Sequence, residues 1–155
     1  MSTPEDLIES SKSPGSRSRP ASTKFAYAAL NQGLALAPAI EVEVEGREGT
    51  WFPFRMLPDS GASGTVFPRK HAVPLGFDLR VCEKVDVDTG NGKTKHWRAP
   101  RPIKARVSGR EIQLRACFGN IGVPVLGRED FFSEFYVEVD ERNRFVKITP
   151  HDDLA

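Results

Sequence analysis

One carboxylic acid, Asp59, stands at a turn of small residues and is the first candidate for chemistry in this chain. Residues 59–63 read Asp-Ser-Gly-Ala-Ser and follow an apolar segment at residues 52–57. Small side chains at such a turn let another backbone approach closely, so a carboxyl group here can take part in acid–base chemistry on a bound molecule. A second apolar segment ends in glycine at residues 123–128, Val-Pro-Val-Leu-Gly-Arg.

These two motifs together resemble the signature of the retropepsin-like aspartic proteases. That signature is Asp-Thr/Ser-Gly-Ala/Ser, followed later by two hydrophobic residues, Gly and Arg before a helix, and the likeness runs from about residue 38 to about residue 150. The resemblance implies an all-β fold, the retropepsin-like acid protease β-barrel with one short C-terminal helix and one lobe per chain. It also implies an aspartic endopeptidase that acts on a peptide or protein substrate and needs no cofactor.

The chemistry implied by the resemblance needs two carboxyl groups. In aspartic proteases two close carboxyls share one proton, because both cannot readily ionise. The carboxylate takes a proton from a water, which attacks the peptide carbonyl, while the protonated partner donates a hydrogen bond and then a proton to the carbonyl oxygen. This chain has one Asp-Ser-Gly sequence. Catalysis by Asp59 therefore requires a homodimer whose two-fold axis passes through the active site.

The resemblance also gives roles to the neighbouring residues. Ser60 corresponds to the hydroxyl that hydrogen-bonds across the dimer, Gly61 offers bare backbone to the substrate, and Ala62 keeps the floor of the site shallow. Residues 89–93 correspond to the tip of a flap, a mobile hairpin that closes over an extended peptide. The implied substrate-binding residues are Leu57, Val66, Thr89, Gly90, Asn91, Gly92, Val125 and Leu126.

The chain departs from the family pattern at two places. Viral members often have acidic residues after the first motif, where this chain has Ser63 and Gly64, so Arg128 lacks its usual carboxylate partner. The second motif continues with Glu129 and Asp130 rather than with Asp or Asn directly after the arginine. Both departures concern the contacts of the dimer and leave the catalytic acid in place.

Alternating hydrophobicity predicts short strands along most of the chain. Residues 40–45 alternate Ile or Val with Glu, which is typical of a half-buried strand, and residues 50–57 return from a turn at 46–49 to deliver Asp59. Further strands are expected at 65–68 and in hairpins that pair 85–88 with 93–97, 103–107 with 112–114, and 136–139 with 145–148. About eight or more strands indicate a closed or partly closed β-barrel.

The best helix candidate is the segment 129–135. Phe131, Phe132 and Phe135 cluster on one side of such a helix and are expected in the core. Its first turn carries two acids, which the helix dipole favours. Residues 26–30 fit either a short strand or half a helix, and Pro74 keeps any helix after residue 69 brief.

The composition describes one domain without a bias in charge. The chain has 155 residues, and its 22 basic and 21 acidic residues nearly cancel, so no nucleic-acid partner is expected. Cys82 and Cys117 are expected to be free thiols in a reducing compartment, with one bridge not excluded. Residues 1–24 are polar and predict a disordered tail before a protease domain at 25–155. Neither a signal peptide nor a membrane segment is visible, which predicts a cytoplasmic protein without a membrane partner.

Other kinds of site have weaker support in the sequence. The three histidines are scattered and Pro58 stands where serine proteases usually have Gly, which disfavours a Ser-His-Asp site. The chain has neither His-Glu-x-x-His nor Cys-x-x-Cys, so no metal is expected. Residues 58–61 alone would also suit an ordinary turn. The alternative function is a catalytically weak or inactive retropepsin-fold module that binds peptides or dimerises.

Overall fold

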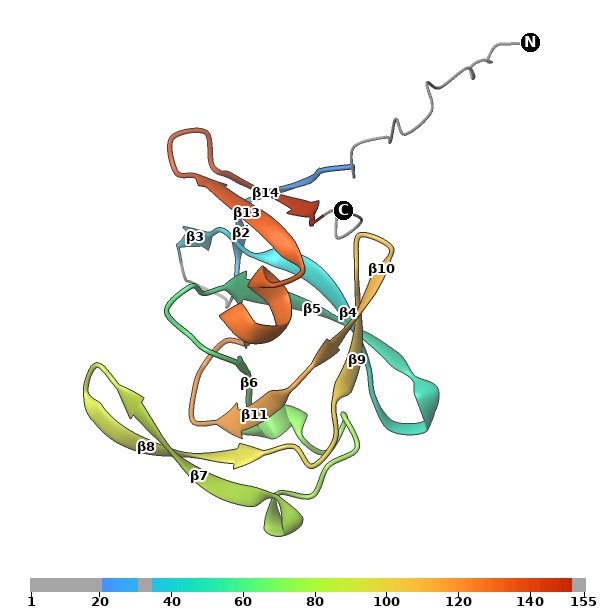
Figure 1. The fold of residues 1–155 in the computed structure, drawn as a ribbon, viewed down its shortest axis with the longest axis vertical. Coiled ribbons are helices and arrows are strands. Elements are labelled where there is room, and N and C mark those ends of the chain that lie inside the picture. The colour runs from blue at the N-terminus through green and yellow to red at the C-terminus, as the bar shows by residue number, and fades with distance from the viewer. Residues whose placement is uncertain (1–20, 31–34, 152–155) are drawn as a thin grey trace.

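The computed structural model describes residues 21–30 and 35–151, and nearly all of its regular structure is strand. Nine strands form one curled sheet in the order β10-β9-β4-β5-β12-β6-β11-β8-β7 (Figure 1). Their bounds are β4 Ile40–Glu45, β5 Trp51–Pro58, β6 Thr65–Pro68, β7 Glu83–Thr89, β8 Gly92–Arg98, β9 Ile103–Val107, β10 Arg110–Leu114, β11 Ala116–Gly119 and β12 Val125–Leu126. Among the described residues the edge strands β10 and β7 have no further partner, so the barrel is only partly closed.

The other strands of the described residues form two smaller sheets. The first has the order β1-β14-β13, with β1 Thr23–Ala26, β14 Phe145–Pro150 and β13 Phe135–Asp140, and it lies at the opposite end of the molecule from the β7–β8 hairpin (Figure 1). The second pairs β2 Ala28–Ala29 with β3 Leu36–Ala37, which settles residues 26–30 in favour of strand. Residues 1–20 of the predicted tail lie outside the described residues, whereas Thr23 and Lys24 at its end belong to β1.

The hairpin that delivers Asp59 follows the alternation of its sequence. Ile40, Val42 and Val44 of β4 are buried, and the glutamates between them face outward, as predicted. β4 pairs antiparallel with β5 through the short 3-10 helix η1, Arg47–Gly49. Two more 3-10 helices, η2 Arg69–His71 and η3 Leu79–Val81, follow β6, and η2 agrees with the brief helix expected before Pro74.

The predicted helix at 129–135 is shorter and differs in kind. It is a five-residue π-helix, η4, Arg128–Phe132, and Phe135 instead begins β13, where it pairs with Pro150. Strand pairing at the chain's end overrides the helical spacing of the phenylalanines. The prediction that this cluster lies in the core is confirmed for Phe131 and Phe135, which are buried and stack with their ring centroids 5.0 Å apart.

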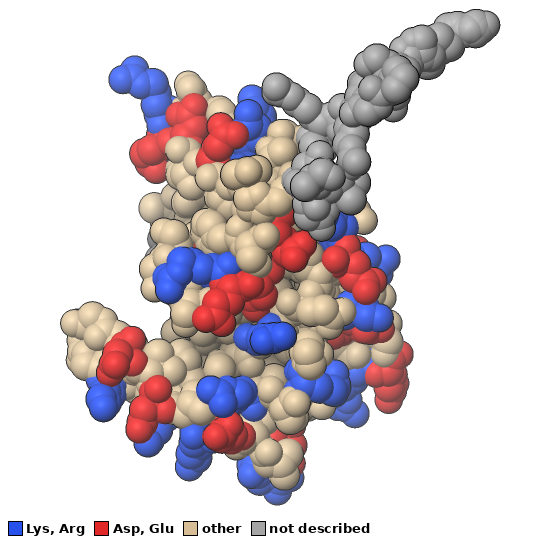
Figure 2. Space-filling view, viewed as in Figure 1, with Lys and Arg blue, Asp and Glu red and all other residues tan. Residues whose placement is uncertain are grey.

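The surface charges and the two cysteines agree with the expectations from the composition. Lys and Arg alternate with Asp and Glu over the visible face, without a field of one sign (Figure 2). Cys82 and Cys117 are both free thiols. No helix among the described residues is long and apolar enough to cross a membrane.

Candidate active site

Asp59 is fixed at the end of β5 by backbone hydrogen bonds from the second motif. The Leu57 amide donates to the carbonyl of Pro124 over 3.0 Å, and the Asp59 amide donates to the carbonyl of Leu126 over 2.9 Å. β12 lies parallel to β5 and antiparallel to β6, so it fills the space between the two strands that flank the turn. The two sequence motifs therefore form one structural unit around the acid.

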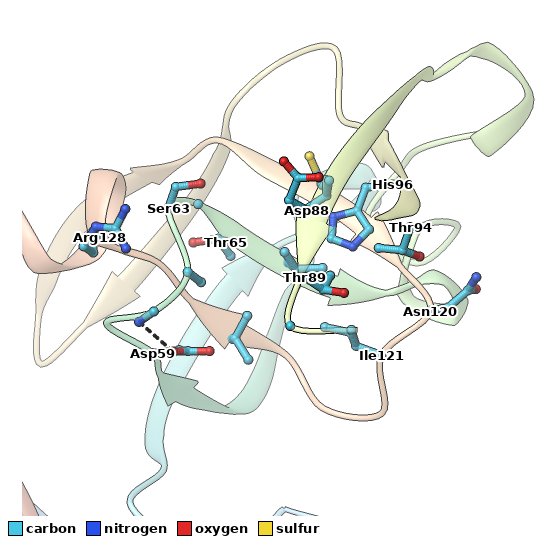
Figure 3. A pocket seen from close by; sticks show the side chains of 18 of the residues that line it. Asp59, Ser63, Thr65, Asp88, Thr89, Thr94, His96, Asn120, Ile121 and Arg128 are labelled. Atoms are coloured by element: carbon cyan, nitrogen blue, oxygen red, sulfur yellow. Dashed lines mark hydrogen bonds between the residues drawn. The ribbon is translucent and has the colours of Figure 1, made fainter. Parts of the chain in front are cut away.

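The carboxyl group of Asp59 is half-buried and opens toward a cleft (Figure 3). Its Oδ1 accepts a hydrogen bond of 2.8 Å from the Gly61 amide. A Cβ on residue 61 would lie only 3.2 Å from this oxygen, so glycine keeps the side of the carboxylate open. The arrangement holds one oxygen in place and leaves the other able to engage water or a second carboxyl.

The rest of the loop is tied to the start of η4. The Arg128 amide donates to the carbonyl of Ala62, and the Glu129 amide donates to that of Ser63, both over 2.9 Å. The Arg128 guanidinium donates to the carbonyl of Ser60 over 2.8 Å. Arg128 thus finds a backbone oxygen of the active-site loop in place of the carboxylate that the family pattern would supply, and it stiffens the same loop.

Asp130 plays a structural part that the sequence did not reveal. Its buried carboxylate accepts a hydrogen bond from the Thr65 hydroxyl over 2.9 Å and another from the Arg115 amide over 2.9 Å. Burial raises the pKa of this carboxyl, and the two hydrogen bonds oppose that rise. Asp130 joins η4 to β6 and to the entry of β11, and so supports the loop from beneath.

The cleft has a volume of about 980 Å³ and lies between the Asp59 loop and the β7–β8 hairpin. Eight of the predicted site residues line it: Asp59, Gly61, Ala62, Val66, Thr89, Gly90, Asn91 and Val125. The hairpin contains residues 89–93, which were predicted as the tip of a flap, and Thr89 pairs with Gly92 across its two-residue tip. The structure thus brings together the acid, most of its loop and the tip of the hairpin.

Four predicted residues lie outside the lining of the cleft. Leu126 is fully buried in the core, because successive strand residues point to opposite faces and Val125 faces the cleft. Leu57 is half-buried in β5 opposite Val125. Ser60 and Gly92 are exposed, on the loop and on the hairpin tip respectively.

Several lining residues were missed from the sequence. The inner face of the hairpin adds Val87, Thr94 and His96, and the wall opposite adds a further group: Cys117, Asn120, Ile121 and Val123. Thr94 pairs with Val87 and His96 pairs with Val85, so all four side chains share one face of the hairpin. Counting the register outward from the predicted turn would have found the two polar members.

His96 is the most enclosed polar side chain that the β7–β8 hairpin contributes to the cleft. It is 7% exposed, and its ring lies over Gly119, where a Cβ would come within 2.7 Å of the imidazole. Burial lowers the pKa of His96 and raises the pKa of the neighbouring Cys117 thiol, so both favour their neutral forms.

Comparison with known proteins identifies the family of this site. The family model described as aspartyl protease matches residues 40–118. The chain belongs to this family. The matched span contains Asp59 and its loop, while the second motif at 123–128 follows the span.

A solved structure of a retropepsin-like protease has the same fold. A retropepsin-like aspartic protease from Rickettsia conorii is 19% identical, with a TM-score of 0.59 over 84% of this chain and 92% of that one. EIAV protease complexed with the inhibitor HBY-793 is 24% identical, with a TM-score of 0.48 over 64% of this chain and 88% of that one. No curated protein matches the chain by sequence. The predicted retropepsin-like β fold is confirmed by the Rickettsia structure.

Proposed function

We propose that the chain is an aspartic endopeptidase in which two Asp59 carboxyls of a homodimer activate the attacking water. The observation that carries the proposal is the position of Asp59, fixed by β12 and open to a cleft beneath a hairpin. Membership of the aspartyl protease family gives this geometry its chemical meaning. A single chain supplies one such acid, so the second comes from an identical subunit.

The reaction follows from the shared proton. One Asp59 is ionised and removes a proton from water, and the other is protonated and hydrogen-bonds the scissile carbonyl oxygen. The hydrogen bond from Gly61 holds the accepting oxygen, and Arg128 stiffens the loop behind it. The β7–β8 hairpin covers the extended substrate and limits access of bulk water. Ser60 and the tip residues 89–92 retain their predicted roles in the dimer contact and in substrate binding.

The test compares Asp59→Asn with Asp78→Asn in hydrolysis of a peptide library. Asp78 is matched chemically and lies on the surface, where it pairs with Arg80. We expect Asp59→Asn to abolish hydrolysis and Asp78→Asn to retain it, with both variants folded and dimeric by sedimentation. Hydrolysis by Asp59→Asn at the wild-type rate would refute the mechanism. A folded dimer with no wild-type hydrolysis would favour the alternative of a peptide-binding module.

A further inference from the structure

The part of the cleft under β8 presents polar groups between apolar walls. Thr94 and His96 lie on the inner face of the hairpin, and Asn120, which follows β11, borders the same cleft (Figure 3). We propose that these three residues form a subsite for a substrate side chain that ends in a carbonyl oxygen, either the carboxamide of glutamine or the carboxylate of glutamate. This inference rests on the proposed function, because it takes the cleft to hold a peptide.

The orientation of Asn120 makes it a donor. Its Oδ1 accepts a hydrogen bond of 3.3 Å from the Arg69 guanidinium. Arginine can only donate, so this contact assigns the oxygen and leaves the amide NH₂ available to a ligand. Arg69 is itself held, because its guanidinium lies 4.3 Å from the centre of the Trp97 ring. The exposed Asn120 side chain is thus oriented by its contact with Arg69.

His96 adds a second group that can donate. Its imidazole is held against Gly119 and borders the cleft, and within the described part of the chain its nitrogens are neither bonded to protein nor sealed from the cleft. The neutral ring carries one N–H that either nitrogen can hold. The Thr94 hydroxyl, on the same face of the hairpin, can donate as well. Three groups that can donate line this part of the cleft, which favours an acceptor at the end of the bound side chain.

The walls define the rest of the ligand. Val87 and Ile121 line the same cleft and are half-buried, so they can cover a short apolar stem. Two methylene groups followed by a carbonyl oxygen meet both requirements. Among charged residues of the lining, Asp59 and Asp88 oppose a carboxylate, while Arg115 and Arg128 attract one. Because these charges act in opposite directions, the test compares glutamine with glutamate.

The test uses Asn120→Asp, which keeps the shape and the contact with Arg69 but replaces the NH₂ donor by an acceptor oxygen. Gln113→Glu is the matched control, since it makes the same amide-to-acid change at an exposed site on β10. A peptide library is offered with Gln, Glu or Met at each position. Hydrolysis is followed by mass spectrometry for the wild type, and retention of peptides is followed on immobilised Asp59→Asn protein.

We expect Gln or Glu to exceed Met at one position by roughly tenfold, which corresponds to one well-formed hydrogen bond. In Asn120→Asp the preference for Glu should disappear and that for Gln should fall, while Gln113→Glu should behave as the wild type. Equal use of Gln, Glu and Met, or an unchanged preference in Asn120→Asp, would overturn the subsite even if Asp59→Asn abolished hydrolysis. If the wild type hydrolysed nothing, the proposed function would fail, and peptide retention alone would decide the subsite by the same comparison.

Discussion

Gly127 packs against the backbone of Gly64 so closely that a Cβ on Gly127 would lie 2.4 Å from the carbonyl carbon and oxygen of Gly64. Gly127 has φ −96°, which any residue can adopt, so space rather than backbone conformation requires glycine there. Gly64 follows the active-site loop and Gly127 belongs to the second motif. The contact explains physically why the two motifs occur together in one chain.

Gly127→Ala should therefore destabilise the fold. The atoms that a methyl group would meet are backbone and cannot rotate away, so we expect a loss of at least about 1–3 kcal/mol in the free energy of unfolding, as in overpacked cores. Gly90→Ala is the control, because nothing lies within 4 Å of a Cβ at that position. Urea denaturation followed by circular dichroism measures both. Equal stability of the two variants would show that the loop and η4 separate freely.

The Thr65–Asp130 hydrogen bond should couple the two residues energetically. Thr65→Val removes the hydroxyl that donates to Asp130 over 2.9 Å and leaves a buried acceptor unpaired, so we expect a loss of about 1–3 kcal/mol. In the double variant Thr65→Val with Asp130→Asn, the effects should not add, because both act on one contact. Denaturation of the four proteins gives the coupling free energy. Strict additivity would mean that the contact contributes nothing.

The sequence predicted those parts of the fold that depend on local pattern. The prediction of β4 was correct, because a strand that alternates Ile or Val with Glu can bury only one of its two faces. The spacing of Phe131 and Phe135 suited a helix, but the pairing of Phe135 with Pro150 is a long-range contact that no local pattern contains. The hydrogen bond that Asp130 of the π-helical turn accepts from Thr65 is likewise a long-range contact.

In the candidate site, too, the residues in local motifs were predicted, and those brought together by long-range strand pairing were missed. Asp59 and the hairpin tip were predicted, because each lies in a short motif with its own turn chemistry. Leu126 was placed in the pocket by resemblance, yet the alternation within β12 gives that face to Val125. His96 and Asn120 were missed, since their shared location arises from the pairing of β11 with β8. The structure gives the positions of these residues, and the catalytic role of Asp59 and the roles of its neighbours stay predictions.

The tip of the hairpin should depend on glycine at residue 92. Gly92 has φ +111°, and no atom lies within 4 Å of a Cβ there, so conformation rather than space limits the substitution. Gly92→Ala should cost about 1–2 kcal/mol, typical of a side chain forced to positive φ. Hydrogen exchange should accelerate in β7 and β8 but not in β4. Gly90→Ala, where no positive φ occurs, serves as the control, and unchanged exchange in Gly92→Ala would contradict the argument.

His96 should make stability depend on pH on the acid side of neutrality. Burial lowers its pKa in the folded protein below the ordinary value of 6.5, so on acidification the unfolded chain binds a proton first. The contribution of His96 to stability is therefore full above about pH 6.5 and decreases as the pH falls toward the folded pKa. His96→Gln has no such group, and its free energy of unfolding should fall less than that of the wild type between pH 7 and pH 5.

Some dependence should persist in His96→Gln, because burial also lowers the pKa of His71. The double variant with His71→Gln should then have the flattest profile of the three proteins. Urea denaturation at half-unit steps of pH gives the comparison, with the curves aligned at pH 8, where the neutral rings contribute no difference in proton binding. Parallel curves for wild type and His96→Gln would show that this ring titrates alike in the folded and unfolded chain, and that the wall under β8 is open to water.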